Sequence, residues 1–260
     1  LKAVIAALRD PQSGCPWDIA QTHASLTRYA LEEAYEVVDA IEHGSMADLR
    51  DELGDLLLQV VLHARIAEEA GHFVLEDVVQ GLTRKMVRRH PHVFSDRRYD
   101  SIEEQKADWE AIKQQERGQT AENNMPPRVL AGVAHAQPAL QRAHQLQKRA
   151  ASVGFDWDDL SPVFSKIEEE VAEIRDALAQ QEPEHRIREE VGDLLFATVN
   201  LARHLGVNAE EALRKGNHKF EARFASVEDA AQMQGRDLTV CSLEEMEQWW
   251  QAAKLQDKAV

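Results

Sequence analysis

Acidic residues occur in four pairs, each with a separation of three positions, and such pairs can bind a metal ion. In a helix this separation puts both side chains on the same face. Two carboxylates about 5 Å apart repel each other by roughly 3 kcal/mol, so a cluster of them requires a counter-charge. Magnesium prefers oxygen ligands and is usually held by a few carboxylates together with substrate phosphates. The pairs are Glu33 and Glu36, Glu52 and Asp55, Glu170 and Glu173, and Glu190 and Asp193.

A lone acidic pair most often belongs to a solvated helix face. Three features favour a metal site here. The pairs lie beside the most apolar segment of each half, 56–62 and 194–201, and they recur with the same partners in both halves. In addition, Gly54 and Gly192 each stand between two acidic residues. A mid-helix glycine costs about 1 kcal/mol relative to alanine, and it would let a neighbour or ligand approach closely.

The acidic pairs belong to a unit that occurs twice. Residues 50–58 and 188–196 agree at six of nine positions. Other landmarks recur in the same order, with an offset that drifts from 140 to 134 residues, as changes in loop length would produce. They are Gly14, Trp17 and Asp18 with Gly154, Trp157 and Asp158, and Lys85 and Arg89 with Lys219 and Arg223. We therefore predict a duplicated domain, with copies at 1–120 and 121–260, joined by a polar linker at 118–127.

Both copies show the apolar periodicity of helices, over 26–42, 46–71, 161–181 and 184–205. Ser161 is the expected N-cap of the third segment, with Pro162 at its first helical position. Gly71 and Gly206 suit helix C-termini. Short connections make consecutive helices antiparallel neighbours, so that their acidic pairs can face each other. Wide apolar stripes on such helices need partners, which predicts an all-α bundle and a homodimer.

The composition excludes several classes of function. A net charge of −16 argues against a nucleic acid or an anionic membrane as the main partner. Two cysteines, Cys15 and Cys241, are too few for a disulfide framework. No apolar run reaches the ~18 residues of a membrane span, and no signal-peptide pattern opens the sequence. These features predict a cytoplasmic protein. A glycine-rich phosphate loop and a serine nucleophile elbow are also missing from the sequence.

The acidic signature resembles that of the MazG family of all-α nucleoside triphosphate pyrophosphohydrolases. That signature is Glu-Glu-x-x-Glu, a spacer, and Glu-x-x-Asp, and it occurs here at 32–36 with 52–55 and at 169–173 with 190–193. The run Cys15-Pro16-Trp17-Asp18 and the duplicated layout are typical of two-domain bacterial members, so the resemblance covers nearly the whole chain. A single signature is shared with dimeric dUTPases and phosphoribosyl-ATP pyrophosphohydrolase, whereas two together are highly specific.

The resemblance implies four-helix-bundle cores completed by dimerisation. It also implies dependence on magnesium, with manganese as a substitute, and hydrolysis of many NTPs and dNTPs to monophosphate and pyrophosphate, which would clean or regulate nucleotide pools. The C-terminal copy would be the main catalytic unit. The implied metal ligands are Glu170, Glu173, Glu190 and Asp193, with Glu33, Glu36, Glu52 and Asp55 as N-terminal counterparts. The implied substrate contacts are Glu169, Lys219, Arg223, Trp250 and Lys254.

These residues suggest a mechanism. Two or more magnesium ions would bridge the phosphates, lower the pKa of a water molecule and stabilise developing charge. Glu169 or Glu170 would accept the proton of the water that attacks the α-phosphorus. Disabling Glu173 should then impair metal-dependent turnover.

Three other features each have a structural alternative. Lys219 and Arg223, four residues apart, either neutralise phosphate or form an ordinary basic face. We expect packing for Trp249 and a ligand contact for Trp250. The tract 88–92 contains two histidines, but Pro91 keeps them off a common helix face, so we expect a structural role there.

Two alternatives to a broad enzyme stay open. A non-catalytic helical protein would bind nucleotides or a protein partner and use the acidic cluster only for metal; it would not release pyrophosphate. A narrow enzyme such as a dUTPase would differ in turnover across the eight common NTPs and dNTPs.

Overall fold

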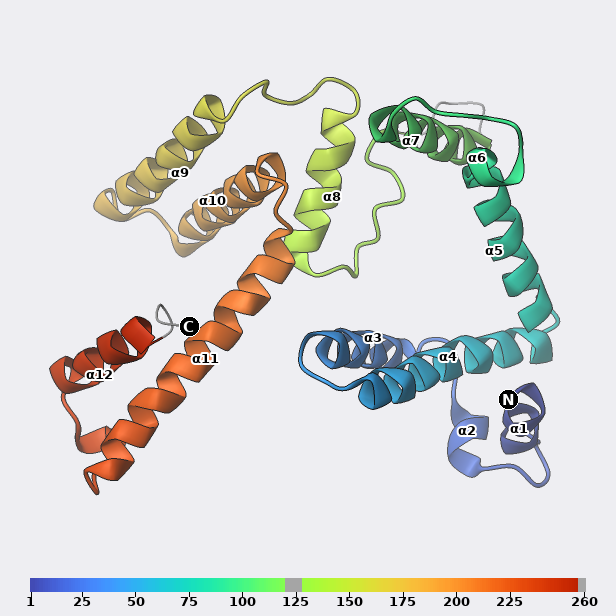
Figure 1. Cartoon of the computed structure of the whole chain (residues 1–260), viewed down its shortest axis with the longest axis horizontal. Helices are drawn as coiled ribbons and strands as arrows, with labels where there is room; N and C mark the ends of the chain where they lie inside the picture. The colour runs from blue at the N-terminus through green and yellow to red at the C-terminus, as the bar shows by residue number, and fades with distance from the viewer. Residues whose placement is uncertain (120–127, 257–260) are drawn as a thin grey trace. The chain divides into compact units, whose positions relative to one another are not determined.

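The computed structural model describes residues 1–119 and 128–256, and all the regular elements in those ranges are helices (Figure 1). This confirms the predicted all-α class for the described residues. The contacts divide the chain into two units, Leu1–Glu122 and Asn123–Val260. Within the described ranges, none of the helices is long and apolar enough to cross a membrane.

The first unit is built around an antiparallel helix pair, α3 (Thr27–Glu42) and α4 (Met46–Glu69). The tight turn between them ends in a capping box, because the Ser45 hydroxyl accepts from the Asp48 amide while the Asp48 carboxylate accepts from the Ser45 amide. Ile5, Leu26, Val61 and Leu62 form a buried core beneath the pair. The other helices are α1 (Lys2–Leu8), α2 (Pro16–Ala20), α5 (Leu75–Arg89), α6 (Pro91–Phe94) and α7 (Ile102–Gln119).

The second unit repeats this pair as α9 (Ser161–Ala179) and α10 (Glu184–His204). Helix α8 (Ala139–Ala151) packs against α10. The long α11 (Ala209–Met233) then leaves the bundle, and after a 3-10 turn at Leu238–Val240 the chain returns along it as α12 (Leu243–Gln256) (Figure 1). The repeated helix pair therefore places both acidic signatures in the same kind of local structure.

The helix ends agree with the predicted bounds to within two residues, with one correction. Gly71 and Gly206 follow α4 and α10 in the left-handed region, at φ 71° and 70°, as expected for helix C-termini. The predicted N-cap of α9 is wrong, because Ser161 is already the first helical residue and Leu160 holds the N-cap position. The Asp159 carboxylate accepts from the Ser161 amide at 2.8 Å, so the capping oxygen comes from two residues earlier.

Helix α7 continues to Gln119, so the first two residues of the predicted linker are helical. The rest of that linker, at 120–127, lies outside the described residues, as does the boundary predicted near residue 120.

The predicted apolar stripes are only half covered within each unit. Val61 and Ala64 are buried in the first unit, but Leu57 on the same helix is 51% exposed. In the second unit, Val191 and Leu195 of α10 are 41% and 53% exposed. Each helix pair thus leaves an apolar face in solvent.

Candidate active site

The second helix pair brings three of its four signature carboxylates together. Oxygens of Glu170 on α9 and of Glu190 and Asp193 on α10 all lie within 4.8 Å of one another. Glu170 and Glu190 are 3% and 7% exposed, whereas Asp193 is exposed. Two carboxylates this deeply buried would be very unfavourable without a nearby positive charge.

Two cations supply that charge. Lys166 pairs with Glu170 at 2.8 Å and with Glu169 at 2.9 Å. Arg186 pairs with Glu190 at 2.6 Å and with Glu189 at 2.5 Å. The carboxylates, first Glu170 and then Glu169, hold the pKa of Lys166 above its ordinary value. Each buried carboxylate of the cluster is therefore paired with one cation, and a bound metal ion would compete with these cations for the carboxylates.

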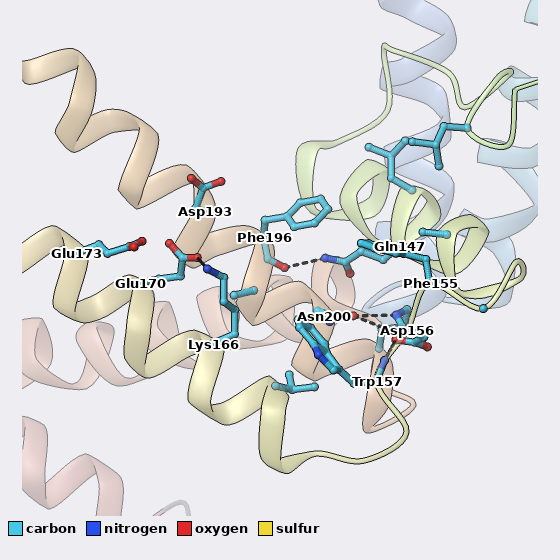
Figure 2. A pocket seen from close by; sticks show the side chains of 17 residues that line it. Gln147, Phe155, Asp156, Trp157, Lys166, Glu170, Glu173, Asp193, Phe196 and Asn200 are labelled. Atoms are coloured by element: carbon cyan, nitrogen blue, oxygen red, sulfur yellow. Dashed lines mark hydrogen bonds and ion pairs between the residues drawn. The ribbon is translucent and has the colours of Figure 1, made fainter.

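Glu173, the fourth member of the signature, lines the same cavity as Glu170 and Asp193 (Figure 2). Its pKa is raised above the ordinary value, mainly by desolvation and then by the charges of Glu170 and Glu190. Among the described residues, Oε2 of Glu170 has no hydrogen-bond partner although it is buried. A buried lone acceptor, mutual repulsion and an all-oxygen donor set fit a hard divalent cation.

The first helix pair forms a similar cluster from Glu33, Glu36 and Glu52, again within 4.8 Å, while Asp55 is exposed. Burial, and then the charges of Glu36 and Asp55, raise the pKa of Glu33. Gln59 donates from Nε2 to Glu33 at 3.4 Å. The two clusters thus share two signature positions, Glu33 with Glu170 and Glu52 with Glu190, but the third member is Glu36 in the first and Asp193 in the second, and only Glu170 and Glu190 are buried.

The two clusters also differ in their cations. The repeat places Tyr29 where the second copy has Lys166, and Asp48 where it has Arg186. The first cluster therefore lacks these two counter-charges.

Both signature glycines border open space. A Cβ added at Gly54 or Gly192 would meet no atom of the described chain within 4 Å. A close neighbour within the described chain therefore does not explain either glycine.

Of the five predicted substrate contacts, Glu169 lies on α9 beside the cluster, and the other four lie elsewhere, on α11 and α12. The Arg223 guanidinium lies 5.8 Å from the centre of the Trp250 ring, and Trp250 lies 5.2 Å from Phe220. Lys219 shares this helix and Lys254 follows Trp250 by one turn. None of these four residues lines the cavity that contains Glu170. Within one chain, the structure does not bring the predicted nucleotide contacts to the carboxylates.

In the first copy, Arg89 of the predicted basic pair and its neighbour Arg88 share one carboxylate. The Arg89 guanidinium pairs with Glu116 of α7 at 2.5 Å, and Arg88 pairs with the same carboxylate at 2.5 Å. This holds the pKa of Glu116 below its ordinary value, Arg89 contributing most. His90 and His92, whose rings are 5.8 Å apart, bond to the Met86 carbonyl at 2.7 Å and to Gln105 at 3.0 Å. Those contacts agree with a structural role for the histidine tract.

A cavity of about 740 Å³ opens from the second carboxylate cluster. Figure 2 shows Glu170, Glu173 and Asp193 on one side of it, and the aromatic and amide side chains on the other. Its volume falls within the range of roughly 300–1,000 Å³ that is usual for small-molecule sites. The far side contains Gln147, Phe155, Trp157 and Asn200.

Comparison with known proteins identifies the family. A family model described as the MazG nucleotide pyrophosphohydrolase domain matches residues 21–94 and 161–227. This chain belongs to the MazG family. The nucleoside triphosphate pyrophosphohydrolase of Escherichia coli K12 is 48% identical over 99% of this chain and 97% of its own. The MazG nucleoside triphosphate pyrophosphohydrolase/pyrophosphatase of Thermotoga maritima is 42% identical over 98% and 94%.

A third relative matches only part of the chain. The nucleoside triphosphate pyrophosphohydrolase of Mycobacterium tuberculosis is 43% identical over 58% of this chain and 44% of its own. The two MazG segments include both acidic clusters together with Lys219 and Arg223, while Trp250 and Lys254 lie beyond them. The chain is accordingly a hydrolase of the nucleotide pyrophosphohydrolase class with two MazG segments.

Sequence reasoning did not single out Lys166, Arg186, Gln147 or Asn200. For Asn200, one signal was present, since it is a polar residue inside the apolar run 194–201. A local signal was also present for Lys166 and Arg186, since each lies three and four residues before its two glutamates on the same helix. Gln147 lies on α8, and only the packing of α8 against α10 brings it to the site.

Proposed function

We propose that this MazG protein hydrolyses nucleoside triphosphates, with broad base tolerance and dependence on magnesium, to the monophosphate and pyrophosphate. The observation that carries the proposal is the second cluster, where Glu170, Asp193 and the cation Lys166 line one end of a cavity of about 740 Å³, with Glu190 and its partner Arg186 beside them. The names of the relatives from E. coli and T. maritima, both nucleoside triphosphate pyrophosphohydrolases, support the same substrate class.

The residues of the second copy would divide the work. Glu170, Glu173, Glu190 and Asp193 would hold magnesium, with manganese as a substitute. When bound, the metal supplies positive charge for the phosphates and lowers the pKa of a nearby water molecule. Lys166 and Arg186 would move from their carboxylates toward phosphate oxygens. Glu169 or Glu170 would accept the proton of the water that attacks the α-phosphorus, as the bond to the bridging oxygen of pyrophosphate breaks.

We also propose a homodimer. Lys219, Arg223, Trp250 and Lys254 lie on α11 and α12, outside the cavity of their own chain, so a second copy would bring such a group to each cavity. The exposed apolar face of α10 would then be buried as part of a four-helix core.

The first copy would contribute less to turnover. Its acidic cluster has Tyr29 and Asp48 in place of the two cations, and its Arg89 is engaged by Glu116. We infer that this copy binds a metal ion but holds a triphosphate weakly.

The two free cysteines, both partly exposed, fit a reducing cytoplasm.

The decisive experiment is product analysis with magnesium for a matched pair of variants. Glu190→Gln should lower monophosphate and pyrophosphate release by about 100-fold or more, whereas the counterpart Glu52→Gln should leave most turnover. Nucleotide binding by the wild type without any pyrophosphate release would overturn the proposal in favour of a binding protein. Release from dUTP but from none of the eight common triphosphates would replace it by a narrow dUTPase.

A further inference from the structure

The far side of the cavity contains two buried amide side chains with fixed orientations. The Asn200 side chain, 8% exposed, accepts through Oδ1 from Arg203 Nε at 3.0 Å and from Nη2 at 2.7 Å. Arg203 is itself held by Asp156 at 2.9 and 2.5 Å. Because the Asn200 oxygen faces a guanidinium, which only donates, the carboxamide cannot flip. Its Nδ2 group is therefore a fixed donor.

Gln147 provides the complementary group. It is 7% exposed and donates from Nε2 to the Phe196 carbonyl at 2.8 Å, which fixes its orientation in turn. Among the described residues its Oε1 has no hydrogen-bond partner. A buried acceptor without a partner is costly for a fold, so a donor on a ligand is its natural complement. Phe196, whose carbonyl holds Gln147, and Asn200 are one helical turn apart on α10, and both amide side chains line the same cavity.

An aromatic surface borders these amides. Trp157 and Phe155, 42% and 83% exposed, line the same cavity, and Figure 2 shows Trp157 close to Asn200 and on the side away from Glu173. Exposed aromatic rings are surfaces on which nucleobases stack.

We propose that Asn200 and Gln147 read the Watson–Crick edge of the substrate's base while Trp157 stacks on its face. This inference rests on the proposed function and deepens it. Each common base has a donor beside an acceptor on that edge, such as N6–H and N1 in adenine, N4–H and N3 in cytosine, N1–H and O6 in guanine, or N3–H and O4 in uracil. Adenine and cytosine present an exocyclic donor beside a ring acceptor, whereas guanine and uracil present the reverse order, so an acceptor and a donor that cannot flip should give adenine and cytosine the lower KM.

The internal repeat provides a comparison within the chain. The positions that correspond to Asn200 and Gln147 in the first copy are Leu62, which belongs to the buried core, and Ala7. Neither side chain can form a hydrogen bond. The base-reading pair thus belongs to the same copy that has Lys166 and Arg186.

The test compares ATP with purine riboside triphosphate, which has hydrogen in place of the 6-amino group and so keeps the acceptor N1 but loses the donor. For the wild type, KM should be about tenfold higher for the analogue with kcat little changed, because the Gln147 oxygen stays unpaired. Gln147→Met should raise KM for ATP and bring the ratio of the two KM values close to one. Asn200→Asp should raise both KM values together, because both substrates keep N1.

Gln59→Met is the matched control, since Gln59 is also 7% exposed with an unpartnered Oε1 but lies in the first unit; it should leave the ratio unchanged. Equal KM values in the wild type, or a ratio that survives Gln147→Met, would overturn the assignment. If Gln147→Met does not fold, the ratio of the KM values for ATP and the analogue on the wild-type protein still tests the assignment. Absence of pyrophosphate from ATP would instead refute the proposed activity, and calorimetric binding of ATP and the analogue would then test base reading separately.

Discussion

Lys166 lies one helical turn before Glu170 and pairs with it at 2.8 Å, so the most buried carboxylate of the cluster has an ammonium group as its counter-charge. In the metal-free protein this ammonium group balances a carboxylate charge that a bound metal ion would balance instead. Lys166 therefore stabilises the metal-free protein and also lies in the site at which we propose hydrolysis.

Replacing Lys166 by methionine should therefore lower stability when no metal is present. We expect a loss of about 1–2 kcal/mol, because a buried carboxylate is left without a cation while Lys166 itself is partly exposed. Magnesium should then raise Tm more in the variant than in the wild type, which calorimetry can measure. Lys215→Met is the control, since the Lys215–Glu211 pair is exposed. An equal effect of magnesium on Lys166→Met and wild type would contradict this explanation.

If the proposed homodimer forms, Leu195→Glu should convert it into a monomer. Leu195 is 53% exposed on the apolar face of α10, and a charge there opposes burial against a second copy. Light scattering coupled to size exclusion would show the change in mass, and turnover should fall with it. Met46→Glu, at a position that is 79% exposed at the start of α4, should leave the mass unchanged. A dimeric, active Leu195→Glu protein would argue against a shared site.

Gln181→Gly should stabilise the protein by about 0.5–1 kcal/mol, because Gln181 adopts φ 53° directly after α9, where glycine has no side-chain conflict. Urea denaturation would measure the gain. The reverse change, Gly206→Ala, is the control: its φ is 70° and an added Cβ meets nothing within 4 Å, so any loss is purely conformational. A less stable Gln181→Gly protein would mean that the Gln181 side chain contributes contacts of its own.

His63 should make the first unit less stable in acid. It stacks on His23 with the two Nδ1 atoms 2.8 Å apart, and burial, followed by the neighbouring imidazole, lowers its pKa below the ordinary 6.5. The unfolded chain binds the proton first, so stability falls as pH drops below 6.5 and levels off below the lowered pKa.

Calorimetry of the full chain between about pH 7.5 and about pH 5.5 would show this loss, which His63→Gln should reduce. The same loss of stability in the variant would assign the pH effect to other groups.

The helices could be predicted from the sequence because apolar spacing and the residues at helix ends determine where they form. Apolar spacing set α3, α4, α9 and α10, and Gly71 and Gly206 marked two of their ends. Spacing also put the acidic pairs on common faces. Which carboxylates converge could not be predicted, because it depends on how the two helices pack, and Asp193 but not Glu173 belongs to the tight group.

Contacts between distant segments escaped prediction for the same reason. The Arg89–Glu116 pair joins residues from α5 and α7, and Gln147 reaches the Phe196 carbonyl from another helix. No periodicity encodes such contacts, since they depend on how helices pack and not on how each one forms.

The capping box at the start of α4 has no counterpart at the start of α10 in the second copy. Asp48 and Arg186 are both the third residue of their helices, and α10 begins after Pro183 without a side-chain cap. An acid at this position secures the first turn, a contribution of about 0.5–2 kcal/mol for a good cap, whereas arginine leaves the turn less secure but gives Glu190 its cation. If Arg186 contacts phosphate as proposed, helix capping and catalysis make opposite demands on this position, and the two copies of the unit satisfy one demand each.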